Sequence, residues 1–334
     1  MKYKSVIVTK KGGPEALQVV ENELRPPAAG EARIRVLATA IGGTDLAYRS
    51  GVSPLAPRIT FVPGYEMVGV VDALGDGVTN AAVGDRVAAL TGHGAYSEYI
   101  YLAKEHLVPV PPALDAAEAA LLVLNYATAY QALHRVAKAQ RGQKVLVIGA
   151  SGGVGLCLLE LGRLAGLSLY GTASPSKHDL IRRLGAIPLD YHVPGWIDAV
   201  RQAEPGGLDF VFDGVGGGYF DAGFGLLRKR GTLVEYAIAR GWDGLLFGLA
   251  KIALWNLLPN GRSVTFYGIS ALYARDKRPF REDLPVLFKM LAEGQLKPVI
   301  ANRLPLLEAA RGHTLLESGE VSGNIVLLAP ELLG

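Results

Sequence analysis

Charged and apolar side chains alternate with a two-residue period in the first third of the chain. Between Glu31 and Ala40 every second residue is apolar, which is typical of a strand with one buried face. Residues 67–73 and 86–89 are further short apolar runs, separated by turns rich in glycine and aspartate. Several short strands at this close spacing predict a small barrel-like β domain.

The pattern changes near residue 115, beyond which helical and strand-like segments alternate. Residues 115–135 are typical of a helix, and residues 144–148 (Lys-Val-Leu-Val-Ile) of a compact buried strand. Further strands are expected at 167–172, 188–191, 208–212, 232–236 and 264–267, with helices at 176–184, 196–202 and 219–227. This alternation predicts a parallel, doubly wound sheet of six strands. The tail beyond about residue 270 is expected to end in a helix (307–316) and a strand (324–328).

Composition and charge narrow the class of protein. With 334 residues, 50% of them hydrophobic and 19% charged, the chain has material for about two folded domains. The 34 basic and 31 acidic residues nearly cancel, so binding to nucleic acid or to an anionic membrane is not expected. No signal peptide or membrane-spanning segment is expected. The apolar stretch 245–258, interrupted by Lys251, is expected to be a core or interface helix.

Cys157 is the only cysteine in the sequence. A single cysteine forms no internal disulfide and cannot build a cysteine-rich structural zinc site. A reducing, cytoplasmic location therefore fits best. Cys157 follows Gly155 by two residues, so we expect it in the first turn of a helix, where a small apolar side chain packs well.

A glycine-rich turn follows the strand at 144–148 directly. It comprises residues 149–155 (Gly-Ala-Ser-Gly-Gly-Val-Gly), in which Ala150, Gly152 and Gly155 have the spacing of a dinucleotide-binding turn. Gly152 would let the backbone approach a pyrophosphate, Gly155 would let the next helix pack closely, and the helix N-terminus would offer free N–H groups to the anion. The position between a strand and a helix is the context that this motif requires.

The next strand indicates which nicotinamide cofactor is preferred. An NAD site places an acid about 20 residues after the glycines, on the ribose 2′-hydroxyl. Here the strand ends in residues 172–177 (Thr-Ala-Ser-Pro-Ser-Lys), and Asp179 lies too far into the following helix. Ser174 and Lys177 would instead bind a 2′-phosphate through a hydrogen bond and a charge, so NADPH is favoured over NADH.

Other segments carry recognisable motifs in a fixed order. They are residues 62–66 (Val-Pro-Gly-Tyr-Glu) with 69–71 (Gly-Val-Val), 83–87 (Val-Gly-Asp-Arg-Val), 94–99 (Gly-Ala-Tyr-Ser-Glu-Tyr), 128–130 (Thr-Ala-Tyr) and 213–217 (Asp-Gly-Val-Gly-Gly). Together they make nearly the whole chain resemble the zinc-independent medium-chain dehydrogenases/reductases of the quinone oxidoreductase (zeta-crystallin-like) branch.

The resemblance implies an α/β fold of two domains. A GroES-like β-barrel catalytic domain would comprise residues 1–122 and 270–334, and a Rossmann domain with a doubly wound parallel six-stranded sheet would comprise residues 123–269. It also implies a small-molecule substrate bound in a cleft between the domains, and a homodimer.

The resemblance further implies roles for individual residues in binding the cofactor. Ser151, Gly152, Gly153 and Val154 would hold the pyrophosphate, while Ser174, Lys177 and Tyr191 would surround the 2′-phosphate and ribose. Thr128 would lie near the nicotinamide ribose, Gly214 and Val215 on the adenosine side, and Tyr236 and Ala237 near the nicotinamide. Asn324 stands where many relatives have a Lys or Asn that reaches the cofactor. For Tyr191 and Tyr236, an aromatic ring that only packs remains an equal alternative.

The positions that match the zinc ligands of metal-dependent relatives hold other residues in this chain. Gly42 replaces a cysteine, Tyr65 replaces a histidine, and Asn125 replaces a cysteine or acid. Glycine has no ligating side chain, and Tyr and Asn are poor zinc ligands. No metal is therefore expected, and reaction at an unactivated alcohol is disfavoured because it needs a Lewis acid on the oxygen.

Reduction of a conjugated acceptor, unlike reaction at an unactivated alcohol, does not need a metal ion on the oxygen. Hydride lands on carbon, charge spreads to the carbonyl oxygen, and hydrogen-bond donors stabilise it. Tyr65, Asn125 and Tyr126 are the candidates for contacting the substrate or its enolate, with Tyr48 a weaker one. The expected activity is therefore NADPH-dependent reduction of a quinone or of the activated C=C of an α,β-unsaturated carbonyl compound.

Two alternatives remain open at this stage. Quinone reductases of the family carry polar side chains where this chain has Gly42, Ala47 and Ser53, so a catalytically weak or inactive cofactor-binding protein, like the crystallin or vesicle-protein members of the family, is one alternative. Residues 245–258 would then contact a partner or a membrane surface. Residues 172–179 also resemble the enoyl reductase modules of polyketide synthases, so an acyl-linked enone is another possible substrate.

Overall fold

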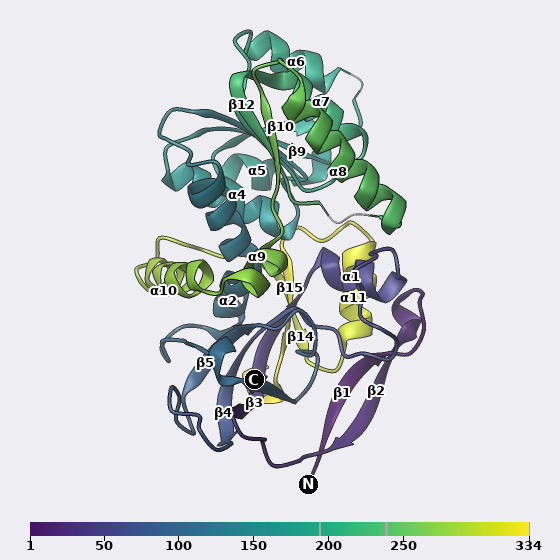
Figure 1. Ribbon diagram of the computed structural model, residues 1–334, viewed down its shortest axis with the longest axis vertical. Coiled ribbons are helices and arrows are strands. Elements are labelled where there is room, and N and C mark those ends of the chain that lie inside the picture. The colour runs from purple at the N-terminus through teal and green to yellow at the C-terminus, as the bar shows by residue number, and fades with distance from the viewer. Residues whose placement is uncertain (194, 238–239, 334) are drawn as a thin grey trace. The chain divides into compact units, whose positions relative to one another are not determined.

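The computed structural model describes residues 1–193, 195–237 and 240–333 (Figure 1). The chain divides into two compact units, Met1–Ala127 with Ser270–Gly334 (unit 1) and Thr128–Ile269 (unit 2). The boundary expected from the sequence, after residue 122, falls in the same helical segment as the observed one.

Unit 1 is built on antiparallel strands, as the alternating pattern predicts. A hairpin of β1 (Lys2–Val8) and β2 (Leu17–Glu23) accompanies a sheet in the order β14-β15-β3-β4-β5-β7, with β6 also paired to β3. The strands are β3 (Glu31–Ile41), β4 (Glu66–Leu74), β5 (Arg86–Leu90), β6 (Tyr99–Ala103), β7 (Val108–Pro109), β14 (Ile300–Pro305) and β15 (Asn324–Leu328). In β3 the apolar residues Ala32, Ile34 and Val36 are buried, and the charged residues between them are half-buried. This confirms the predicted GroES-like domain.

The C-terminal tail belongs to unit 1, and one of its strands joins the sheet there. β15 lies exactly where the sequence predicts a strand and pairs antiparallel with residues 38–41 of β3. Helix α11 (Ala309–Glu317) agrees with the predicted helix in the tail. The sequence pattern did not predict α9 (Ile269–Arg275) and α10 (Arg278–Ala292), the latter with Pro285 inside it. Proline removes a backbone donor, so its presence argues against a helix.

The predicted helix at 115–135 forms as one run of helical turns with two wider stretches. It comprises α2 (Ala116–Leu121), the π-helical η3 (Leu122–Tyr126), α3 (Ala127–Tyr130) and the π-helical η4 (Gln131–Val136). Asp115 caps it by accepting a hydrogen bond from the Glu118 amide. Wider π-helical turns often occur at functional sites, and η3 contains both Asn125 and Tyr126.

Unit 2 contains a parallel sheet of six strands, which confirms the predicted Rossmann fold. Its order is β10-β9-β8-β11-β12-β13, with helices between successive strands (Figure 1). The order reverses between β8 and β11, the point at which such sheets bind ligands. The elements are β8 (Lys144–Ile148), α4 (Gly153–Leu164), β9 (Ser168–Ala173), η5 (Pro175–Lys177), α5 (His178–Arg183), β10 (Ala186–Asp190), α6 (Trp196–Ala203), β11 (Leu208–Asp213), α7 (Gly218–Leu226), β12 (Leu227–Glu235), α8 (Gly241–Leu257) and β13 (Ser263–Phe266).

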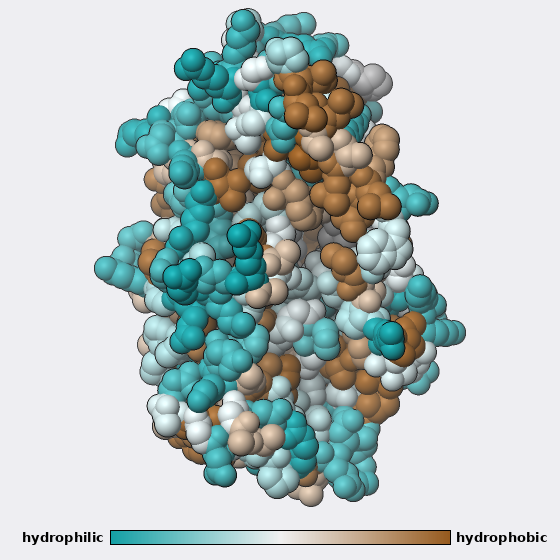
Figure 2. Space-filling model, viewed as in Figure 1, coloured by the Kyte–Doolittle hydropathy of each residue, from teal (hydrophilic) through white to brown (hydrophobic). Residues whose placement is uncertain are grey.

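Helix α8 corrects one expectation. The sequence suggested a core or interface helix at 245–258, but none of the residues of α8 is buried. Only its inner side, with Ile252 and Trp255, packs against the core of unit 2. Apolar side chains gather over α8 on the surface (Figure 2), among them Phe247 and Leu257 with exposures of 69% and 82%. The core interpretation was therefore wrong. None of the described helices is long and apolar enough to cross a bilayer.

Candidate functional site

The glycine-rich turn between β8 and α4 is held in place by the neighbouring strand. The Gly149 amide donates to the Thr172 hydroxyl over 3.0 Å, and the Ala150 amide donates to the Thr172 carbonyl over 3.1 Å. Helix α4 then begins at Gly153, with no side chain capping its N-terminus. Its first amides are therefore available to an anion, as the sequence predicts for a pyrophosphate.

The close packing of this turn requires a glycine at position 155. A Cβ atom there would lie 2.3 Å from the Gly149 carbonyl oxygen and 2.8 Å from the Ala150 backbone. At Gly152 a Cβ would lie 3.3 Å from the same oxygen, which is tight but less severe. Cys157 is buried at the start of the second turn of α4, not in the first as expected, and its thiol donates to the Gly153 carbonyl.

The residues predicted to bind the 2′-phosphate lie at the carboxyl ends of two neighbouring strands. Ala173 of β9 and Asp190 of β10 are partners in register, so Ser174 and Tyr191 leave the sheet next to each other. Lys177 follows in η5; it is half-buried, burial lowers its pKa, and its ammonium has no ion-pair partner among the residues described. Tyr191 is 38% exposed, so its ring is not part of the core.

On the other side of the switch point, the predicted adenosine-side and nicotinamide-side residues contact each other. A Cβ at Gly214 would lie 2.6 Å from the Tyr236 ring, so the turn after β11 lies directly against this ring. Val215 is 49% exposed beside it, and Ala237 follows Tyr236 after the end of β12. Thr128 has a buried hydroxyl oxygen with no hydrogen-bond partner among the described residues. These features fit a bound nicotinamide cofactor, which would supply the missing polar partner.

A cluster of hydroxyl groups surrounds Tyr65 in unit 1. Asp45, in the first turn of α1 (Gly43–Ser50), accepts hydrogen bonds of 2.9 Å from the amides of Gly42 and Gly64, which ties α1 to the segment before β4. One turn further along α1, the ring of Tyr48 lies beside that of Tyr65, with centroids 6.1 Å apart. The Tyr65 hydroxyl is hydrogen-bonded to the Ser270 hydroxyl.

The electrostatics of this cluster keep its hydroxyl groups protonated. Burial raises the pKa of both Tyr65 and Tyr48 above the ordinary value for tyrosine. Burial also raises the pKa of Asp45 to about 6, and burial together with the Asp45 charge raises the pKa of Glu66 well above its usual range. At neutral pH the cluster therefore presents tyrosine O–H groups beside Tyr65.

Asn125 and Asn324 meet in the interior of unit 1. The Asn125 side-chain amide donates to the Asn324 side-chain oxygen over 3.0 Å, and the Asn324 amide donates to the Val299 carbonyl over 3.0 Å. Both residues are buried, as is Tyr126. The resemblance predicts that Asn125 contacts the substrate and Asn324 the cofactor; in this structure the two side chains are hydrogen-bonded to each other.

Ser270 was missed by the sequence reasoning. It lies 205 residues from Tyr65, in α9, and no motif or period in its surroundings points to a functional role. Only the placement of α9 in unit 1 brings its hydroxyl to Tyr65.

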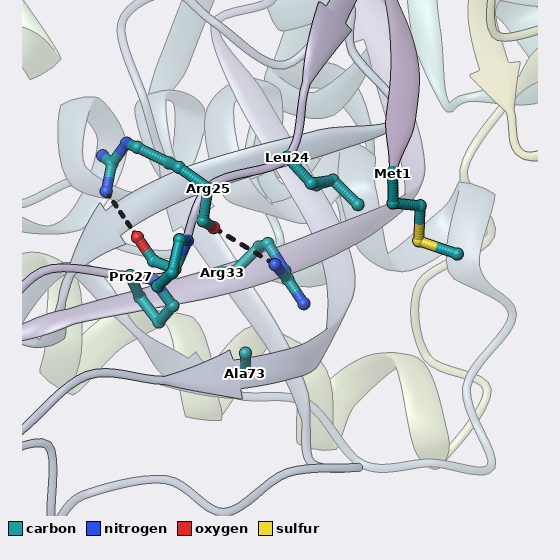
Figure 3. Close-up of a pocket in the computed structure, with 7 residues that line it drawn as sticks. Met1, Leu24, Arg25, Pro27, Arg33 and Ala73 are labelled. Carbon is teal, nitrogen blue, oxygen red and sulfur yellow. Dashed lines mark hydrogen bonds between the residues drawn. The ribbon is translucent and has the colours of Figure 1, made fainter.

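The two cavities described in the structure contain none of the predicted site residues. One, of about 400 Å³, lies in unit 1 and is lined by Met1, Leu24, Arg25, Pro26, Pro27, Arg33 and Ala73 (Figure 3). Its two arginines donate to the backbone carbonyls of Pro26 and Arg25 and form ion pairs with Glu31 and Asp72. The other, of about 450 Å³, lies in unit 2 around Gly206 and Arg228. Neither cavity suggests a competing site.

Within residues 1–193, 195–237 and 240–333, no three His, Cys, Asp or Glu side chains come together as metal ligands. The positions that match the zinc ligands of metal-dependent relatives hold Gly42, Tyr65 and Asn125. Of these, Tyr65 is engaged with Ser270 and Asn125 with Asn324. The donor set at these positions is thus made of hydroxyl and amide groups, which do not suit zinc.

Comparison with known proteins agrees with both units. Residues 28–112 match the family described as alcohol dehydrogenase GroES-like domain, and residues 184–327 match the family described as zinc-binding dehydrogenase. The name zinc-binding dehydrogenase refers to the family as a whole. This chain has Gly42, Tyr65 and Asn125 at the positions of the zinc ligands.

Individual relatives match over nearly the whole chain. The quinone oxidoreductase of Pseudomonas aeruginosa is 33% identical, over 95% of this chain and 97% of the relative. The synaptic vesicle membrane protein VAT-1 homolog of Rattus norvegicus is 31% identical, over 97% of this chain and 83% of the relative. A mycobacterial protein whose structure was solved in complex with NADPH is 31% identical, with a TM-score of 0.84 over 97% of this chain and 99% of that one. The chain belongs to the medium-chain dehydrogenase/reductase family, in its zinc-independent quinone oxidoreductase branch.

Proposed function

We propose that this oxidoreductase transfers hydride from NADPH to a quinone or to the activated C=C of an α,β-unsaturated carbonyl compound, without zinc. The observation that carries the proposal is the hydroxyl cluster at Tyr65. Where metal-dependent relatives would hold a histidine ligand, this chain holds a protonated tyrosine whose hydroxyl is supported by a second hydroxyl. A hydrogen-bond donor of this kind suits an oxygen that gains negative charge during reduction.

The residues of unit 2 would bind the cofactor, and NADPH, when bound, supplies the hydride. The amides at the start of α4 would hold its pyrophosphate, and the turns at Gly214 and Tyr236 would line its adenosine and nicotinamide sides. Tyr65 would donate a hydrogen bond to the carbonyl oxygen of the acceptor. Ser270 and Tyr48 would orient that hydroxyl, so that little reorganisation is needed as charge develops.

Selectivity for NADPH is proposed to rest on Ser174 and Lys177. Because Lys177 has no acidic partner among the described residues, its charge is available to a 2′-phosphate. The relative solved with NADPH supports the same cofactor.

Lys177→Ala is expected to weaken NADPH binding about 10- to 100-fold, because a hydrogen bond to a charged group contributes about 1.5–3 kcal/mol. NADH, which lacks the 2′-phosphate, should bind the variant as it binds the wild type. Fluorescence titration with both cofactors measures the difference. Arg201→Ala, on the exposed side of α6, is the matched control. Equal losses for NADPH and NADH would contradict the proposed role.

The substrate proposal is tested by a turnover screen with NADPH against quinones, free enones and thioester-linked enones. Reduction of quinones or free enones supports the proposal, and activity confined to thioesters would favour an enoyl reductase. Tight NADPH binding without oxidation across the whole panel would instead support an inactive cofactor-binding protein. Elemental analysis of the purified protein tests zinc independently, since stoichiometric zinc would contradict the mechanism.

We also propose a cytoplasmic homodimer in which α8 is covered by a second copy of the chain. Besides Asp243, the only charged residue of α8 is Lys251, which is paired with Asp221. This leaves no unpaired cation on α8 to attract anionic lipid. With 17 residues the helix is about 25 Å long, and β13 beside it is the last strand of its sheet among the described residues. A stable dimer buries about 800 Å² per partner, which a helix of this length with an adjoining strand edge can supply.

The double variant Phe247→Glu/Leu254→Glu places two charges one above the other on the exposed side of α8. We expect it to be monomeric by light scattering after size exclusion, while the wild type is dimeric, because buried unpaired charges oppose association. Val83→Glu, at a similarly exposed position in unit 1, should leave the mass unchanged. A monomeric wild type, or a dimeric double variant, would contradict the proposal.

A further inference from the structure

Two acidic side chains lie side by side at the carboxyl end of the sheet in unit 2. Asp213 is the last residue of β11 and Glu235 the last of β12, and their Cα atoms are partners in the parallel register. Asp213 is fully buried, and Glu235 is half-buried. No role in cofactor binding or catalysis has been given to either residue above.

One oxygen of each carboxyl group has no hydrogen-bond donor among the described residues. Asp213 Oδ1 accepts from the amides of Val215 and Gly216 at 2.8 and 3.0 Å. Asp213 Oδ2 and Glu235 Oε2 are both buried, and no N–H or hydroxyl donor among the described residues reaches them. A buried carboxylate oxygen without a donor is costly, but a single proton between two carboxyl groups satisfies both.

We infer that Asp213 and Glu235 share one proton and that this proton-bound pair positions the two turns that hold the nicotinamide cofactor. The first turn is residues 214–217, which Asp213 fixes through its bonds to Val215 and Gly216. The second is the segment that leaves β12 at Tyr236, whose amide donates to the Asp213 carbonyl over 2.9 Å. Both residues are positioning residues, and neither reacts.

The shared proton affects the position of both turns because the turns are in close contact with each other. A Cβ at Gly214 would already collide with the Tyr236 ring. Loss of the shared proton would place two buried negative charges on adjacent strands, and their repulsion would separate the strand ends that carry these turns. The inference rests on the proposed function in one respect, namely that these turns bind NADPH.

Two tyrosines lie around the pair, Tyr236 after β12 and Tyr219 on α7, and their raised pKa values keep both neutral at physiological pH. Cys157 on α4 lies next to Tyr236. No lysine or arginine affects the pKa of either acid. Burial raises the pKa of both, and burial with the Asp213 charge raises that of Glu235 to about 9. The pair therefore holds its proton at pH 7 and loses it in mildly alkaline solution.

The test compares the wild type with Glu235→Gln, whose amide donates a hydrogen bond to Asp213 at every pH. Because Lys177 loses its charge at alkaline pH in both proteins, the comparison is between their two profiles. From pH 7.5 to pH 10 we expect the Kd of the wild type for NADPH to rise at least tenfold more than that of E235Q. Asp198→Asn, on the exposed side of α6, controls for loss of a carboxylate and should follow the wild type. Equal pH dependence in wild type and E235Q would overturn the inference.

A second measurement needs no cofactor. The folded state holds a proton that the unfolded state releases above the ordinary glutamate pKa, so the pair's contribution to stability falls as the pH rises from that value to about 9. The thermal midpoint of the wild type should decline over this window more than that of E235Q. If the midpoints behave in this way but neither the wild type nor E235Q binds NADPH, the result supports the shared proton and contradicts the proposed function.

A third measurement uses the wild type alone, in case E235Q does not fold. Difference infrared spectroscopy should show the C=O stretching band of a protonated carboxyl group at pH 7.5, which disappears between pH 8 and pH 10. Absence of such a band at pH 7.5 would overturn the inference.

Discussion

Replacing Gly155 by valine is expected to abolish NADPH binding and to destabilise unit 2. Even the first added carbon would lie 2.3 Å from the Gly149 carbonyl oxygen and 2.8 Å from the Ala150 backbone, so the helix and the turn must move apart. Moving α4 also removes its amides from the anion site. We expect the Kd for NADPH to rise more than 100-fold and the free energy of unfolding to fall by about 2–4 kcal/mol.

Fluorescence titration with NADPH and denaturant unfolding measure the two effects. Gly206→Ala is the matched control, since a Cβ at that position meets no atom within 4 Å and its backbone does not require glycine. The control should bind NADPH as the wild type does. If G155V binds NADPH normally, the turn is not the pyrophosphate site.

Replacing Tyr65 by phenylalanine is expected to lower kcat about 100- to 1,000-fold, the loss typical when one donor to a developing oxyanion is removed. The ring and its packing remain, so folding and NADPH affinity should be unchanged. KM should change much less than kcat, because the hydrogen bond strengthens as negative charge develops on the acceptor. Steady-state kinetics with the best substrate of the screen measure the split.

Two further variants define the role of the neighbouring hydroxyls. Ser270→Ala and Tyr48→Phe remove groups that orient Tyr65, so we expect each to lower kcat less than Y65F does. Tyr101→Phe, whose hydroxyl bonds the backbone of Arg25, should leave kcat unchanged. A fully active Y65F would show that the stabilising hydrogen bond comes from elsewhere.

The cofactor turn could be predicted from sequence because its requirements are local. A strand, a glycine spacing and a helix start follow one another within residues 144–157, and each is recognisable from neighbouring residues alone. The same holds for β15, whose residues 325–328 form one apolar run. The exposure of α8 could not be predicted in this way, since an apolar helix has the same sequence pattern whether its partner is the core of its own unit or another surface.

The residues around Tyr65 show the opposite case. Tyr65 stood out because it occupies a position where relatives bind zinc, but nothing near Ser270 in the sequence marks it as its partner, 205 residues away. The sequence likewise does not indicate that Asn125 and Asn324, 199 residues apart, are hydrogen-bonded to each other. Such side-chain pairs depend on how the C-terminal tail packs in unit 1. There β15 pairs with β3, and this strand pairing is a property of the whole sheet.

By itself, the sequence determined the two kinds of domain, the parallel six-stranded sheet, the family and the absence of zinc-ligating residues at the family's metal positions. The domain types and the sheet follow from periodicity and spacing, which short-range backbone geometry imposes on adjacent residues. The family and its metal positions follow from a resemblance carried by several motifs in a fixed order. Only the tertiary structure decided that Ser270 supports Tyr65, that Asn125 pairs with Asn324, and that Asp213 and Glu235 lie in register with two buried oxygens facing no donor. The physical reason is that strand register and chain return bring together side chains whose local sequences carry no record of each other.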